Sequence, residues 1–171
     1  MTNPFSLFKL PVQFEIDQTL LSEHFLQLQK QFHPDNFATQ STQEQRLAMQ
    51  QSAEINDALK TLKDPILRAE AIIQIHTGEV QDLEQKSTQD MAFLMQQLQW
   101  REQLEEIETN KDDTALDEFR SDIEAEQKIL LNQLKTELTQ SDWSSAQVTA
   151  DKLRFIKKLI EQIEMVEEKL F

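Results

Sequence analysis

The stretch Gln29-Lys-Gln-Phe-His33-Pro34-Asp35-Asn-Phe37 lies between two long helical patterns and decides how the first part of the chain folds. The apolar residues before it recur at helical spacing: Leu21, Phe25, Leu28 and Phe32. Pro34 disfavours helical geometry in the residue before it, so the first helix, capped by Asp17, should end there. A second helix should begin at the capping-box pattern Ser41-Thr-Gln-Glu44. The sequence therefore predicts an antiparallel helical hairpin with His33-Pro34-Asp35 at its tip.

The rest of the chain also favours helices. There is one glycine and there are four prolines, whereas proteins rich in β-hairpins need glycine at turns with positive φ. Asp64-Pro65 should open a further helix, and Gly78 suits its end. Three longer helical patterns follow, at Thr88–Glu108, Thr114–Leu138 and Trp143–Leu170. Because short connections join them, we predict an all-α chain that ends in an antiparallel three-helix bundle.

A change in composition divides the chain into two parts. A chain of 171 residues is long enough for two small domains. The polar stretch from Gly78 to Ser87 is poor in hydrophobic residues and indicates a junction. We therefore expect an N-terminal helical domain at residues 1–77, a junction at 78–87 and the helical bundle at 88–171.

Charge and composition exclude several classes of function. The net charge is −14, so phosphate backbones would be repelled and nucleic acid is not expected as a partner. No apolar run approaches the roughly 20 residues that span a bilayer, and no signal-peptide pattern is present at the N-terminus, so no membrane partner is expected and the location should be cytoplasmic. With no cysteine and three widely spaced histidines, we expect neither a metal site nor another cofactor.

The tripeptide His33-Pro34-Asp35 is a candidate contact for a partner protein. Proline restricts the backbone, so the polar side chains beside it lose less entropy when they bind. The alternative is an inert turn, because proline and aspartate are ordinary turn residues.

A second candidate surface lies on the helix expected from Thr88 to Glu108, which has too many apolar residues to bury only one side. A helical projection puts Phe93, Trp100, Leu104 and Ile107 on one face. It puts Met91, Leu94, Met95 and Leu98 on a roughly opposite face, with Glu102 beside them. The first face can enter the bundle, whereas the second either packs elsewhere or binds a protein through adaptable Met and Leu side chains, with Arg101 and Glu102 as rim charges.

The tripeptide stands in a context that resembles a J-domain. It follows Leu28-Gln-Lys-Gln-Phe32 and precedes a long helix with Ala53-Glu-Ile-Asn-Asp-Ala-Leu and Leu62-Lys-Asp-Pro65. The later segments Ala92-Phe-Leu-Met-Gln-Gln-Leu and Lys152-Leu-Arg-Phe-Ile-Lys-Lys-Leu159 resemble the C-terminal domain of the HscB family. The resemblance covers essentially the whole chain and implies a J-domain co-chaperone of iron–sulfur cluster biogenesis.

This resemblance implies roles for particular residues. His33, Pro34 and Asp35, with Lys30 on the preceding helix, would contact a DnaK-type chaperone resembling HscA and stimulate its ATPase. The contact with an iron–sulfur cluster scaffold resembling IscU maps onto five residues: Leu94, Met95, Leu98, Glu102 and Phe155. The chain departs from relatives in having Asn36 where many J-domains have lysine, and Gln99 where some relatives are acidic.

Three other functions stay open on sequence grounds. The chain could be a J-domain co-chaperone for other clients, or a structural helical adaptor in which the tripeptide is inert. A hydrolase or metalloenzyme that uses His33 and Asp35 with His24 or His76 is disfavoured, because no paired nucleophile and base or clustered ligand set is visible.

Overall fold

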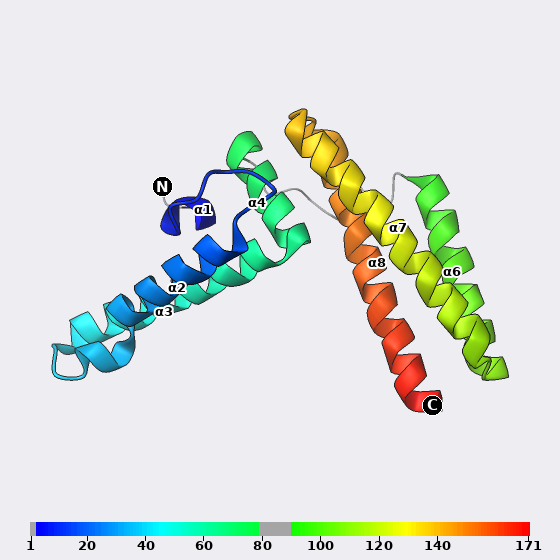
Figure 1. Cartoon of the computed structure of the whole chain (residues 1–171), viewed down its shortest axis with the longest axis horizontal. Coiled ribbons are helices and arrows are strands. Elements are labelled where there is room, and N and C mark those ends of the chain that lie inside the picture. The colour runs from blue at the N-terminus through cyan, green and yellow to red at the C-terminus, as the bar shows by residue number, and fades with distance from the viewer. Residues whose placement is uncertain (1–2, 79–89) are drawn as a thin grey trace. The chain divides into compact units, whose positions relative to one another are not determined.

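The computed structural model describes residues 3–78 and 90–171 of the chain. The chain splits into two compact units, Met1–Gly78 and Glu79–Phe171, and each unit is described by itself. All regular structure in the two described ranges is helical, without a strand (Figure 1). The predicted all-α fold is therefore confirmed. Of the predicted junction at 78–87, Gly78 ends a helix, and residues 79–87 lie outside the described residues.

The N-terminal unit is an antiparallel helical hairpin with shorter helices beside it. Its elements are α1 (Pro4–Leu7), α2 (Gln18–Phe32), the 3-10 turn η1 (Pro34–Phe37), α3 (Thr42–Lys63) and α4 (Pro65–Thr77). Figure 1 shows α2 and α3 side by side, with the connecting loop at the far end of the pair. The predicted hairpin with His33-Pro34-Asp35 in its connection is thus present.

Local capping determines where these helices begin and end. The Asp17 carboxylate accepts a hydrogen bond from Leu20 N at 3.0 Å, and Ser41 Oγ accepts one from Glu44 N at 3.2 Å. Asp64 caps α4 by accepting from Ile66 N at 2.8 Å, with Pro65 at the first helical position. Gly78 closes α4 with a φ of 73°, a left-handed conformation that glycine adopts without steric cost.

The core of this unit is built from all four α-helices. Its largest members are buried aromatic and aliphatic side chains: Phe5, Phe8, Leu21, Leu62 and Ile73. Arg68 is also buried, where it donates a hydrogen bond from Nη1 to the Leu62 carbonyl at 2.7 Å and lies over the Phe14 ring at 4.7 Å. Burial lowers the pKa of this guanidinium from its ordinary value, although Asp64 opposes the shift.

The C-terminal unit is a three-helix bundle of α6 (Met91–Asn110), α7 (Asp113–Thr139) and α8 (Trp143–Leu170). The chain runs along α6, returns along α7 and runs back along α8, so that α6 and α8 are parallel (Figure 1). The core lies between the helices and includes Leu104, Ile107, Phe119, Leu134 and Ile156. The observed bounds of α8 are those that the sequence predicts, whereas α7 is one residue longer at each end than expected.

Polar contacts hold the register of this bundle. Arg120 of α7 pairs with Glu167 of α8, and this pairing raises the pKa of the arginine. Thr149 of α8 donates a hydrogen bond from its buried hydroxyl to the Glu137 carboxylate of α7 at 2.6 Å. Lys169 near the end of α8 pairs with Glu108 near the end of α6 at 3.1 Å. No helix among the described residues has a segment apolar and long enough for a membrane span.

Candidate functional site

The loop His33–Asp35 at the tip of the hairpin is folded on itself. His33 ends α2 and caps η1, and its Nδ1 accepts a hydrogen bond from Asp35 N at 3.1 Å. Asn36 N donates to the His33 carbonyl at 3.0 Å. Because Nδ1 acts as the acceptor, a neutral His33 imidazole carries its proton on Nε2.

Both polar side chains of this loop are open to solvent. The side chain of His33 is 47% exposed and that of Asp35 is 91% exposed, with Nδ1 and the nearer carboxylate oxygen 3.5 Å apart. Pro34 between them fixes the backbone. The tip therefore presents an imidazole and a carboxylate in a constrained arrangement, as a protein contact requires.

Two side chains outside the tripeptide hold the tip in place, and sequence reasoning did not identify either of them. Asn36 donates a hydrogen bond from its side-chain amide to the Lys30 carbonyl in the last turn of α2. Gln45 of α3 donates from Nε2 to the Ala38 carbonyl at 3.0 Å and to the Gln40 carbonyl at 3.2 Å. The tendency of Asn to bond nearby backbone groups was the available signal for Asn36. Lys30 itself has an exposed side chain in that last turn.

The apolar patch predicted on α6 reaches the surface. We define the Leu94–Leu98 patch as Leu94, Met95 and Leu98. Met95 is 58% exposed and Leu98 is 56% exposed, whereas Leu94 is half-buried. Glu102 is exposed one turn beyond Leu98. The opposite stripe turns inward, with Leu104 and Ile107 buried and Phe93 and Trp100 half-buried.

Phe155 of α8 lies against α6. It meets Phe93 edge to face with centroids 5.8 Å apart and stacks on Trp100 at 6.2 Å. The guanidinium of Arg101 lies 5.5 Å from the Phe155 ring centre. Arg101 is three residues beyond Leu98 on α6, so its contact with Phe155 joins α8 to the edge of the Leu94–Leu98 patch. The ring contacts between α6 and α8 were not anticipated from the sequence.

An ion pair fixes the start of α6 next to this aromatic cluster. Asp90 caps α6 by accepting from Phe93 N at 2.9 Å, and Lys152 of α8 pairs with the same carboxylate at 3.2 Å. These two hydrogen bonds, the backbone one first, lower the pKa of Asp90. Lys152 also lies 5.5 Å from the Phe93 ring centre. The contact positions the first turn of α6, which leads into the Leu94–Leu98 patch.

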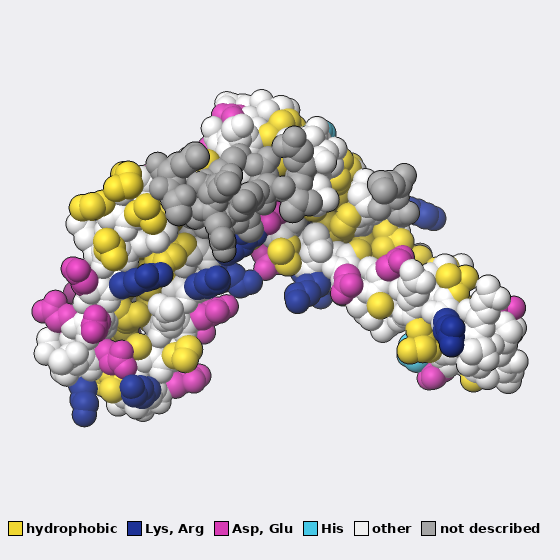
Figure 2. All heavy atoms as spheres, turned by 180° about the vertical axis from the view of Figure 1, so that it is seen from behind, with side chains coloured by type: hydrophobic (Ala, Val, Ile, Leu, Met, Phe, Trp, Pro, Cys, Tyr) yellow, Lys and Arg dark blue, Asp and Glu magenta, His cyan; other side chains and the backbone are white. Residues whose placement is uncertain are grey.

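The histidines lie apart from one another in the part of the N-terminal unit that the structure describes. No group of three or more potential metal ligands occurs within those residues. His24 bonds the Phe8 carbonyl through Nδ1 and precedes His33 by more than two helical turns on α2. Space-filling atoms in Figure 2 show hydrophobic side chains reaching the surface of both units among acidic and basic ones.

Comparison with known proteins identifies relatives over the full length of the chain. The family model described as "HSCB C-terminal oligomerisation domain" matches residues 89–164. A "Co-chaperone protein HscB homolog" of Mannheimia succiniciproducens is 59% identical, covering 99% of this chain and 98% of the relative. The protein of the same description from Pasteurella multocida is 61% identical over 98% of each chain.

A solved structure supports the same relationship. The structure titled "Chaperone HscB from Vibrio cholerae" superposes with a TM-score of 0.94 and is 46% identical in sequence. The match covers 99% of this chain and all of that one. Sequence and fold therefore agree across both units.

Proposed function

The chain belongs to the HscB family of co-chaperones, and from that premise we propose that it binds an iron–sulfur cluster scaffold protein resembling IscU. It then delivers this scaffold to a DnaK-type chaperone resembling HscA and stimulates the ATPase of that chaperone, which promotes transfer of the cluster. The cytoplasmic location expected from the sequence is part of this proposal. One observation carries it: the constrained His33–Asp35 loop and the Leu94–Leu98 patch are both exposed, and they lie on different units.

The His33–Asp35 loop would make the contact with the chaperone. Its backbone is restrained by Pro34 and by the side chain of Asn36, so little conformational entropy is lost when a partner binds. Lys30 adds one exposed positive charge on the adjacent turn of α2. In this proposal the chain makes and breaks no covalent bond, and ATP hydrolysis takes place on the partner.

The Leu94–Leu98 patch, with Phe155 and Glu102, would bind the scaffold. Flexible Leu and Met side chains give adaptable apolar contacts at its centre, and Glu102 supplies charge at the rim. A protein that holds the scaffold on one unit and the chaperone on the other raises the local concentration of client near the chaperone. No new contact between client and chaperone is needed for that effect.

Two single substitutions test this division of labour when both activities are measured on each variant. We expect His33→Gln to abolish stimulation of the chaperone ATPase while scaffold affinity stays unchanged. We expect Leu98→Ala to weaken scaffold binding by about 2 kcal/mol, roughly thirtyfold, if Leu98 is a hot spot. Stimulation without scaffold should stay normal in this second variant.

Matched controls exclude a general loss of structure. His76→Gln changes another exposed histidine, and Ile129→Ala removes an exposed aliphatic side chain of α7, which contributes no residue to either surface. Neither should alter either activity.

Equal loss of both activities in His33→Gln and Leu98→Ala would refute the proposal. Normal stimulation by His33→Gln would leave the inert-turn alternative in place. Normal stimulation by wild type without affinity for any scaffold would favour a co-chaperone for other clients.

A further inference from the structure

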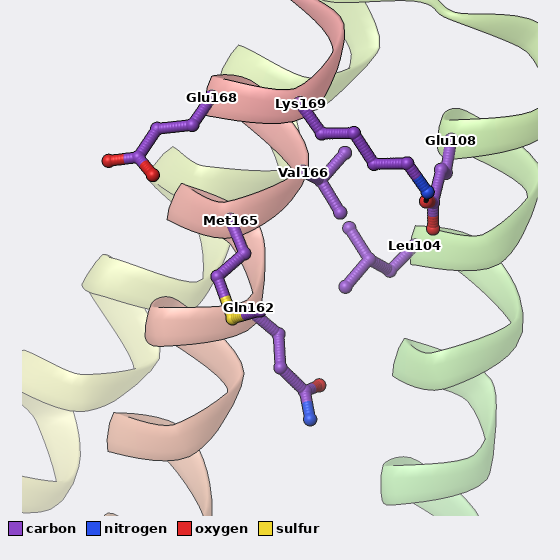
Figure 3. Close-up of a pocket in the computed structure, with 7 residues that line it drawn as sticks. All are labelled: Leu104, Glu108, Gln162, Met165, Val166, Glu168 and Lys169. Atoms are coloured by element: carbon purple, nitrogen blue, oxygen red, sulfur yellow. Dashed lines mark hydrogen bonds and ion pairs between the residues drawn. The ribbon is translucent and has the colours of Figure 1, made fainter.

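A groove between α6 and α8 has no role in the function proposed above. It has a volume of about 580 Å³ and is lined by two residues of α6 and five of α8: Leu104, Glu108, Gln162, Met165, Val166, Glu168 and Lys169. In Figure 3, Leu104 and Val166 point toward each other from the two helices, and Lys169 reaches across to Glu108. The groove therefore has an apolar floor and is bridged at one end by the ion pair between Lys169 and Glu108.

Met165 is the unusual member of this groove. Its side chain is 66% exposed, whereas the floor residues Leu104 and Val166 are nearly buried. An exposed methionine over a hydrophobic floor is a flexible apolar contact that can adapt to an incoming side chain. The polar groups of Gln162 and Lys169 stand at the edge, as in the rim of a protein interface.

The groove continues the line of contacts that begins at the aromatic cluster. Along the boundary between the parallel helices α6 and α8, Phe93 meets Phe155, and further on Glu108 meets Lys169. Trp100, which stacks on Phe155, stands one helical turn before Leu104 in the groove floor. Phe155, a predicted scaffold contact, and the groove thus lie along the boundary between the same two helices.

From this continuity we propose that the groove around Met165 receives an apolar side chain of the same scaffold protein that the Leu94–Leu98 patch binds. This inference rests on the proposed function and extends it. The scaffold would bind at two contact sites: the patch with Phe155, and the groove floored by Leu104 and Val166.

The size of a stable protein interface supports a second contact site for the scaffold. The Leu94–Leu98 patch extends over only about 6 Å of helix axis, whereas a typical specific interface covers about 800 Å² per partner, a region about 30 Å across. Met165 lies one turn before Lys169, which pairs with Glu108, so its level on α6 is near Leu104. Given a rise of 1.5 Å per residue and helix axes 8–10 Å apart, Met165 is within about 15 Å of Leu98. This separation is shorter than the span of a typical interface.

A second copy of this chain is a less suitable occupant. From residue 78 onward the sequence has 22 acidic and 11 basic residues, so two C-terminal units repel each other electrostatically. The description of the matching family model nevertheless names oligomerisation. Self-association is therefore measured as a separate outcome of the test.

The test uses the full-length chain and purified scaffold protein, with affinity measured by calorimetry. We expect Met165→Lys to weaken scaffold binding about tenfold, since it places a charge over an apolar floor that the partner must cover. Ile129→Lys is the matched control, because Ile129 is 59% exposed on α7 and belongs to neither contact site. It should change affinity less than twofold. Met165→Ala, which adds no charge, should give a smaller loss in the same direction.

Each outcome separates the inference from the function on which it rests. If Leu98→Ala weakens binding but neither Met165 variant does, the groove proposal is wrong and the proposed function stands. If none of these three variants weakens binding, the scaffold-binding role of α6 itself fails. If sedimentation shows that wild type is a dimer and Met165→Lys is a monomer with unchanged scaffold affinity, the groove binds a second copy and the proposal is overturned. Circular dichroism melting of the Met165 variants confirms that the bundle is folded in each case.

Discussion

The Trp100 indole of α6 and the Phe155 ring of α8 stack with centroids 6.2 Å apart and planes inclined by 16°. The edge of Phe93 closes one side of this pair and the guanidinium of Arg101 lies over the Phe155 ring. Aromatic and cation–π contacts of this kind restrain ring orientation. Phe155 is therefore held in one position while it remains partly exposed, which lowers the entropy that it loses when a partner covers it.

Replacing Phe155 tests whether this restrained ring contributes to binding. We expect Phe155→Ala to weaken scaffold affinity about tenfold or more, as truncation of a buried aromatic anchor does in other interfaces. Phe155→Leu, which retains apolar volume without the stacking geometry, should fall between wild type and alanine. Calorimetry with the scaffold gives the affinities, and Trp100 fluorescence reports whether the stack is lost.

Phe171→Ala is the control for this experiment. Phe171 is also a partly exposed aromatic residue of the C-terminal unit, but it follows α8 and belongs to neither contact site. Its removal should leave affinity unchanged. If Phe155→Ala binds the scaffold as wild type does while Trp100 emission shifts, the stack is structural and Phe155 is not part of the contact.

The Asp90–Lys152 ion pair predicts a pH dependence of stability in the C-terminal unit. The pKa of Asp90 is lowered in the folded state, chiefly by the bond from Phe93 N and then by Lys152. A carboxylate with a depressed folded pKa stabilises the protein above its unfolded pKa of about 3.9 and loses that contribution as pH falls through the folded value. Asp90→Asn should therefore destabilise the bundle at pH 7, and this difference from wild type should shrink below about pH 4.

Urea unfolding at pH 7 and pH 3 measures this effect. Both tryptophans, Trp100 and Trp143, lie in the C-terminal unit, so their fluorescence follows its unfolding. A double-mutant cycle with Lys152→Gln isolates the pair: in that background the pH-dependent part of the Asp90→Asn effect should become smaller. A difference that stays constant between pH 7 and pH 3 would contradict the assignment.

Local signals predicted most of the fold. Pro34, Pro65 and Gly78 mark helix ends through their own backbone restrictions, so α2 and α4 could be bounded without tertiary information. The bounds of α7 were less accurate because Asp112, which caps that helix by accepting from Ala115 N, stands in a run of polar residues from Glu108 to Thr114 that offers several candidate caps. The helix expected at Thr88–Glu108 begins instead at Met91, because Asp90 caps it by accepting from Phe93 N, and it ends two residues later than expected, at Asn110.

The candidate surfaces were predictable only in part. Helical periodicity placed Met95 and Leu98 on a face away from Leu104 and Ile107, and their exposure agrees with that. The contact of Arg101 with Phe155 depends on the register between two helices more than fifty residues apart, which no local pattern specifies. The binding roles of all nine site residues remain predictions that the experiments above test.

Gly78 offers a test of the backbone at the end of the N-terminal unit. Its φ of 73° is unfavourable for residues with a Cβ atom, although no heavy atom lies within 4 Å of the position that a Cβ would take. Gly78→Ala should therefore destabilise the end of α4 by about 1–2 kcal/mol through strain alone. Gly78→Asn should cost less, because asparagine tolerates the left-handed region better than other residues. Amide hydrogen exchange in α4 measures both, and equal protection in all three proteins would contradict the strain argument.

The Asn36 side chain allows the rigidity of the tip to be separated from its chemistry. Asn36→Ala removes the hydrogen bond to the Lys30 carbonyl but leaves His33, Pro34 and Asp35 unchanged. A looser tip must be ordered when the chaperone binds, so we expect the co-chaperone concentration for half-maximal ATPase stimulation to rise about threefold, roughly 0.6 kcal/mol, while maximal stimulation is kept. His33→Gln should instead abolish ATPase stimulation at every co-chaperone concentration. Steady-state ATPase titrations distinguish the two patterns, with Asn56→Ala on the exposed side of α3 as the control. A lowered maximum in Asn36→Ala would mean that Asn36 itself takes part in the stimulatory contact, because loss of order alone changes affinity and not the activity of the bound complex.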